Sequence, residues 1–90
     1  MTREDLRIHL LELQAELERT PCADQESRQR LRRLMAEVQG AIDCTEEDVR
    51  PRYRSLSAHL REDIRYLEGL NPLLTRYVER IIRTIDLVGL

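Results

Sequence analysis

Aliphatic residues recur at helical spacing in four stretches of this chain, and this repetition constrains its fold more than any other feature. In the first stretch, the leucines follow one another at steps of four, three and four residues. They are Leu6, Leu10, Leu13 and Leu17. Steps of three and four residues place side chains on one side of an α-helix. Because all four stretches share this pattern, the sequence predicts an all-α fold in a single domain, residues 1–90.

Capping residues and prolines mark the ends of the expected helices. The first helix begins at Thr2, which can cap free N–H groups, and it ends before Pro21, because the residue preceding a proline avoids the helical conformation. Asp24 is the N-cap predicted for the second helix, and Asn71, followed by Pro72, is the N-cap predicted for the fourth. The predicted helices span about 2–19, 25–43, 56–68 and 72–88.

Residues 45–54 are predicted to connect the second and third helices, since they show no sustained apolar period and contain Pro51. A helix that is broken at this proline is the alternative. Gly69 is placed to end the third helix, and Gly40 predicts a close approach of a neighbouring backbone within the second. The resulting architecture is a pair of antiparallel helical hairpins, or four-helix bundle, with short connections.

The fourth expected helix is too apolar to be a surface helix with one buried side. A helix this rich in aliphatic residues is normally covered on more than one side, and a chain of 90 residues has few other helices with which to cover it. We therefore expect two copies of the chain to associate as a homodimer that completes the bundle. The residues expected to make this contact are Leu74, Tyr77, Val78, Ile81, Ile82 and Ile85.

Three arginines alternate with other residues, one of them aromatic, in the predicted connector. The arginines are Arg50, Arg52 and Arg54, and the aromatic residue is Tyr53. Such a segment resembles a nucleic-acid-binding arm, because arginine binds phosphate and tyrosine stacks on a base. Three acidic residues lie just before it, however, and the chain carries a net charge of −2. Nucleic acid is therefore a disfavoured partner, and ion pairs with a neighbouring helix are expected instead.

The residue types that carry catalysis or bind metals do not occur at the spacings that such sites need. His9 and His59 fall in different helices, and neither has a His or Cys three or four residues away. Cys22 and Cys44 flank the second helix, which holds them roughly 30 Å apart and so excludes an intrachain disulfide. The glycines are isolated, so no phosphate-binding loop is expected. We predict no enzymatic activity, no cofactor and no metal.

Charge and hydropathy also bear on where the protein is found. Its 15 basic and 17 acidic residues are interleaved along the chain, which favours neither nucleic acid nor an anionic membrane. No signal segment is evident, and no stretch reaches the roughly 18 apolar residues that cross a bilayer. A cytoplasmic protein is therefore expected, without membrane contact.

Two parts of the chain carry a resemblance to a known family. They are Thr2-Arg3-Glu4-Asp5-Leu6 with Leu13, Glu16 and Leu17, and Tyr66-Leu67-Glu68 through Asn71-Pro72-Leu73, continued by Ile81, Ile85 and Gly89-Leu90. Together they resemble a family of short bacterial proteins known as domain of unknown function 4404. Asn71 stands where that family commonly has His, and Leu90 where it commonly ends in Ile. The resemblance implies a compact, bacterial, helical protein, and the family offers no established activity.

Three functions follow from these observations and stay open at this point. The first is a non-enzymatic structural or interaction protein that associates with itself through its fourth helix. The second is a nucleic-acid-binding regulator that uses Arg50, Arg52, Tyr53 and Arg54. The third is an adaptor that offers a groove to a helix of another protein.

Overall fold

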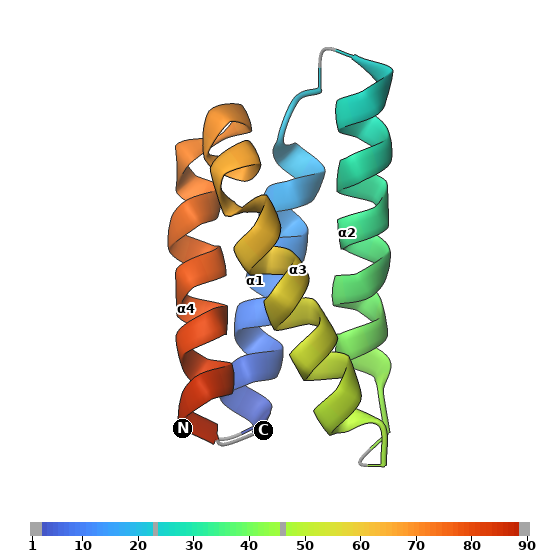
Figure 1. The fold of residues 1–90 in the computed structure, drawn as a ribbon, viewed down its shortest axis with the longest axis vertical. Helices are drawn as coiled ribbons and strands as arrows, with labels where there is room; N and C mark the ends of the chain where they lie inside the picture. Colours follow the sequence, from blue (N-terminus) through green and yellow to red (C-terminus); the bar gives the residue numbers. More distant parts are fainter. Residues whose placement is uncertain (1–2, 23, 46, 89–90) are drawn as a thin grey trace.

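The computed structural model of the chain describes residues 3–22, 24–45 and 47–88. These residues form four helices and no strand, so the all-α prediction is confirmed (Figure 1). The helices are α1 (Arg3–Arg19), α2 (Gln25–Asp43), α3 (Val49–Leu70) and α4 (Pro72–Val88).

The predicted caps of α2 and α4 are confirmed. The Asp24 carboxylate accepts a hydrogen bond from the backbone N–H of Ser27 over 2.7 Å, and this bond holds the pKa of Asp24 below its usual value. At α4, the side-chain oxygen of Asn71 accepts from the backbone N–H of Leu73 over 3.1 Å. Thr2, the predicted cap of the first helix, lies outside the described residues.

The third helix begins earlier than predicted, so the connector expected at residues 45–54 is wrong from residue 49 onward. Val49 starts α3, and Pro51 is its third residue, where a missing N–H costs no helical hydrogen bond. Val49 and Tyr53 are buried and extend the apolar row of the helix toward its start. The other end also differs: Gly69 lies inside the last turn, and α3 ends at Leu70.

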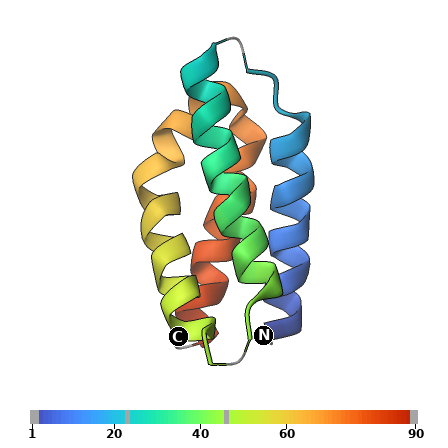
Figure 2. The same ribbon diagram turned by 90° about the vertical axis from the view of Figure 1, so that its right-hand side faces the viewer.

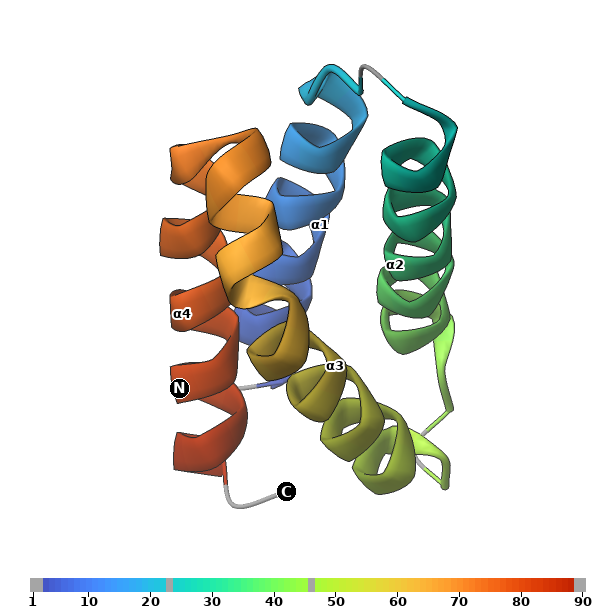
Figure 3. The ribbon, with the colours of Figure 1, turned by 45° about the horizontal axis from the view of Figure 1, so that its top comes forward.

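Each helix packs against two others. The packed pairs are α1 with α2, α1 with α4, α2 with α3, and α3 with α4. Successive helices run in opposite directions, as Figures 1 and 2 show. Seen in Figure 3, α2 and α4 lie on opposite sides of the molecule, with α1 and α3 between them. The molecule measures 37 by 20 by 20 Å.

The core is aliphatic, as the composition predicts, and Tyr53 is its one aromatic residue among the described side chains. The four leucines predicted on one side of the first helix all point into it. They are Leu6, Leu10, Leu13 and Leu17, and each is at most 2% exposed. Within the described residues, the helices lack the length and apolar content that crossing a bilayer requires.

Candidate functional site

The residues predicted to cover a self-association surface fall mostly inside the chain's own core. The buried ones are Leu74, Val78, Ile81 and Ile85, each at most 2% exposed. Tyr77 and Ile82 are half-buried and reach the surface in part. Since α1 and α3 already cover the most apolar side of α4, a partner would meet only Tyr77 and Ile82 from the predicted set.

Large apolar side chains that are exposed lie instead on other sides of two helices. Among the described side chains they are Ile8 (49% exposed), Leu11 (50%), Leu73 (50%) and Leu87 (67%). Two belong to α1 and two to α4, and these helices pack side by side. Isolated exposed apolar residues are common on protein surfaces, so their arrangement decides whether they form a contact surface.

On α1, one row of residues faces outward beside α4. Its members are Ile8, Glu12, Ala15 and Arg19, which follow at steps of four, three and four residues. Leu11 lies outside this row. Relative to Ile8 it is turned about 60° round the helix, on the side opposite to Glu12, which contacts α4. The neighbouring Gln14 donates to Gln39 of α2 over 3.4 Å, so this other side of α1 borders α2.

On α4, a matching row faces outward beside α1. Leu73, Arg80 and Leu87 are spaced seven residues apart, a spacing that brings side chains back to nearly the same side of a helix. All three are exposed, and the half-buried Tyr77 lies on the same side of α4, between this row and the buried Leu74. The two rows and Tyr77 define what we call the α1–α4 face: Ile8, Glu12, Ala15, Arg19, Leu73, Tyr77, Arg80 and Leu87.

An ion pair joins the two rows near the middle of both helices. Arg80 Nη1 donates to Glu12 Oε2 over 3.4 Å, and the two side chains are 51% and 42% exposed. The same carboxylate oxygen lies 4.0 Å from Nδ1 of His9. The α1–α4 face therefore has a charged centre, with Ile8 and Leu87 toward one end and Leu73 toward the other.

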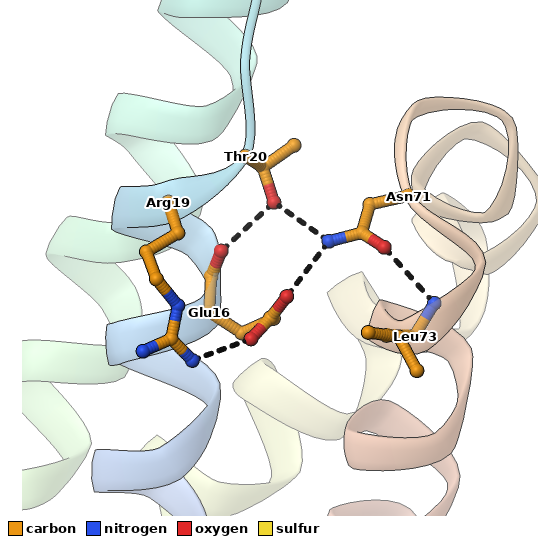
Figure 4. A network of polar contacts seen from close by, with 5 residues as sticks. All are labelled: Glu16, Arg19, Thr20, Asn71 and Leu73. Atoms are coloured by element: carbon orange, nitrogen blue, oxygen red, sulfur yellow. Dashed lines mark hydrogen bonds and ion pairs between the residues drawn. The ribbon is translucent and has the colours of Figure 1, made fainter.

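A polar junction fixes the end of this face at which α1 stops and α4 starts (Figure 4). The side-chain amide of Asn71 donates to Glu16 over 2.9 Å and to Thr20 Oγ1 over 3.3 Å. Arg19 donates to the other carboxylate oxygen of Glu16 over 2.6 Å. The Thr20 hydroxyl donates to the Glu16 carbonyl over 2.8 Å. Both oxygens of a buried carboxylate are thus satisfied.

These contacts also set the charge of the junction. The Arg19 guanidinium, and after it the Asn71 amide, hold the pKa of the Glu16 carboxyl below its usual value of 4.5. Glu16 is therefore an anion at neutral pH, even though its side chain is largely buried. The junction keeps the start of α4 level with the end of α1 and so fixes how the two rows of the α1–α4 face are aligned.

The arginines proposed as a nucleic-acid arm do not lie together with their aromatic residue. Tyr53 is 2% exposed and packs in the core, so it is not available to stack on a base. Arg50, Arg52 and Arg54 are exposed on the first turns of α3. The guanidinium of Arg52 covers Gly40, where a Cβ atom would lie 2.7 Å from Nη1. A side chain, rather than the backbone expected from the sequence, approaches this glycine.

A second polar region lines the boundary between α2 and α3. Arg30 stacks on Tyr66 with its guanidinium carbon 4.5 Å from the ring centre, and the Tyr66 hydroxyl bonds to that of Ser27. The ring nitrogen Nδ1 of His59 lies 2.7 Å from a carboxylate oxygen of Glu37, a contact that sequence reasoning missed. These contacts border a groove of about 300 Å³ with side chains of both charges, and they hold α2 against α3.

Residue types with catalytic or metal-binding chemistry are dispersed. Among the described residues, no three His, Cys, Asp or Glu side chains come together as a metal site would need. His9 belongs to α1 and His59 to α3, while Cys22 and Cys44 lie beyond the two ends of α2 and are not joined in a disulfide. The α1–α4 face is therefore the arrangement in this chain with the strongest claim to a function.

The chain is similar to a known family. The family described as Domain of unknown function (DUF4404) matches residues 6–90, which include nearly all of the four helices. No curated protein and no solved structure is similar enough to count as a match.

Proposed function

The chain belongs to the family described as Domain of unknown function (DUF4404), and we propose that it is a small, non-enzymatic interaction protein that associates with itself as a homodimer. The proposal includes a bacterial, cytoplasmic location, in which the thiols of Cys22 and Cys44 stay reduced. It also includes the arrangement of one chain as an antiparallel four-helix bundle, to which the second copy adds a contact.

The α1–α4 face is the observation that carries this proposal. Ile8, Leu73 and Leu87 are 49%, 50% and 67% exposed on one side of the molecule, whereas the aliphatic rows that face the core are almost completely buried. Apolar residues gathered on one side and mixed with charges are typical of protein contact surfaces. Association would remove them from water and would add to the modest stability of a chain of this size.

Two other functions are supported less well. A nucleic-acid-binding regulator would have to work with three exposed arginines alone, since Tyr53 is buried. Phosphate contacts from so few cations bind weakly and lose affinity steeply with salt. An adaptor for a helix of another protein would use the same exposed apolar residues. The mass of the purified chain in solution distinguishes this function from self-association, because only self-association raises it.

Light scattering coupled to size-exclusion chromatography tests the proposal. We expect the mass to rise toward twice the 10.7 kDa of one chain as the concentration increases through the micromolar range. A mass that stays at 10.7 kDa at every concentration would contradict the homodimer. That result would favour the adaptor function, in which the exposed apolar residues bind a different protein.

A further inference from the structure

We propose that each copy places its α1 against the α4 of the other copy, around a two-fold axis that runs parallel to the helices. This inference rests on the homodimer proposed above and names its contact surface, the α1–α4 face. Three properties of that face lead to this arrangement: the position of its ion pair, the position of its apolar residues, and its size.

The ion pair at the centre of the face selects the direction of the axis. Rotation about an axis parallel to the helices does not change the position of any residue along the helix direction. The Glu12–Arg80 ion pairs of the two copies therefore meet. Glu12 of each copy then faces the partner's Arg80, and four charges of alternating sign lie together. Opposite charges that meet across an interface favour the correct partner and its orientation.

An axis perpendicular to the helices would produce the opposite result. It would place α1 on α1 and α4 on α4. Glu12 lies near the middle of the overlapping part of both helices, so full overlap would bring Glu12 near the partner's Glu12 and Arg80 near the partner's Arg80. Like charges that are brought together in this way disfavour association.

Ile8 and Leu87 fit the same arrangement, whereas Leu73 lies level with the partner's Arg19. Because α1 and α4 run in opposite directions, Ile8 and Leu87 lie on the same side of the Glu12–Arg80 pair, about 6 Å and 10 Å along their helices at 1.5 Å per residue. An axis parallel to the helices therefore brings Ile8 of one copy to the partner's Leu87. Toward the other end, Ala15 meets the partner's Tyr77 in the same way. Apolar contacts thus lie on both sides of the central charges.

The size of the molecule is adequate for such an interface. The side that holds α1 and α4 measures up to 37 by 20 Å. Stable protein interfaces bury about 800 Å² on each partner. The area of this side of the molecule is of the same order.

Leu11 provides a matched control for the apolar contacts. Ile8 and Leu11 belong to the same helix and are almost equally exposed, at 49% and 50%, but Leu11 points toward the α2 side. We expect Ile8→Gln and Leu87→Gln each to raise the dissociation constant of the dimer about tenfold. Leu11→Gln is expected to leave it unchanged, as measured by sedimentation equilibrium. If Leu11→Gln weakens the dimer as much as Ile8→Gln does, the assignment of the face is wrong.

The double charge swap Glu12→Arg with Arg80→Glu tests the direction of the axis. In the proposed arrangement this variant keeps alternating charges with its own copies, so it forms a homodimer. In a mixed dimer with the parent chain, the introduced arginine would face the parent's Arg80 and the introduced glutamate would face the parent's Glu12, so mixed dimers are disfavoured. Both positions are exposed, so the exchange leaves the fold intact, which circular dichroism checks.

Native mass spectrometry of an equal mixture of parent and double-swap chains separates the outcomes. The proposed axis predicts two homodimers and mixed dimers at well below the statistical half of the total. Mixed dimers above that share would overturn the proposed axis, because only α1 on α1 favours them, and mixed dimers at that share would overturn it because the charges would then not meet across the interface. Failure of the homodimer itself is distinguishable, since the parent chain would then give no dimer at all.

Discussion

The side-chain amide of Asn71 donates a hydrogen bond of 2.9 Å to the buried carboxylate of Glu16, and so joins the start of α4 to the end of α1. The same Asn71 side chain caps α4 through its oxygen. Asn71 therefore caps the start of α4 and also fixes the position of α4 along the axis of α1. The alignment of the α1–α4 face depends on this double role.

Replacing Asn71 by Ala is expected to destabilise the chain. Loss of the α4 cap alone costs about 1 kcal/mol of unfolding free energy, and loss of the bond to Glu16 adds to that cost. Urea denaturation measures the change. Asn71→Ser is the control, because serine restores a cap and is too short to replace the amide that reaches Glu16. A variant Asn71→Ala that unfolds at the same urea concentration as the parent would contradict the structural role of this residue.

Acid is expected to destabilise the chain as the carboxylates of Glu16 and Asp24 become protonated. Both groups have folded-state pKa values below their usual ones. The stability that they contribute is therefore complete above the unfolded-state pKa, near 4.5 for Glu16, and is lost as the pH falls through the lower folded-state value. Melting temperatures should be constant from neutral pH to about that value and then decline. For Glu16→Gln, we expect lower stability at neutral pH and a smaller decline in acid; an unchanged decline would argue against Glu16 as its source.

Two adjacent leucines of α1 are expected to respond differently to truncation. Leu10 is fully buried, whereas Leu11 is 50% exposed. Leu10→Ala leaves a cavity and should lower the unfolding free energy by about 2–5 kcal/mol. The matched Leu11→Ala change should stay within about 0.5 kcal/mol. Equal losses in chemical denaturation would show that α1 is rotated relative to the arrangement described above.

Gly40→Ala is expected to stabilise the chain. Alanine in a helix interior is favoured over glycine by about 1 kcal/mol. The new Cβ would meet only the guanidinium end of Arg52, which is exposed and can turn away. Thermal denaturation measures the effect, and Gly40→Ala combined with Arg52→Ala is the control in which nothing has to move. A loss of stability in the single variant that the double variant reverses would mean that the Arg52 contact is worth more than the helix propensity.

Much of the fold is predictable from local signals. The N-caps Asp24 and Asn71 and the leucines of α1 occupy the positions that their chemistry predicts, because caps and apolar periods act within a few residues of one another. The start of α3 is not predictable in the same way. Tyr53 stands among arginines, so its pattern resembles a surface segment, and its burial depends on helices that lie far away in the sequence.

The candidate surface is harder to find from the sequence than the fold. Counting apolar residues on α4 leads to Leu74 and Val78, which the chain buries itself. The outward rows mix apolar side chains with charged ones, so their mean hydropathy is low. They can be recognised only when the packing of α1 and α4 brings Glu12 and Arg80 together. A seven-residue spacing such as that of Leu73, Arg80 and Leu87 is the signal that sequence reasoning missed.

Magnetic resonance of a mixed sample tests the central claim most directly. Isotope-labelled chains are combined with unlabelled chains, and only contacts between different copies are recorded. Self-association through the α1–α4 face predicts contacts between the methyl groups of Ile8 and the partner's Leu87, and none from Leu11. An absence of any contact between copies at concentrations in the millimolar range, or contacts made by Leu11 in place of Ile8, would contradict it.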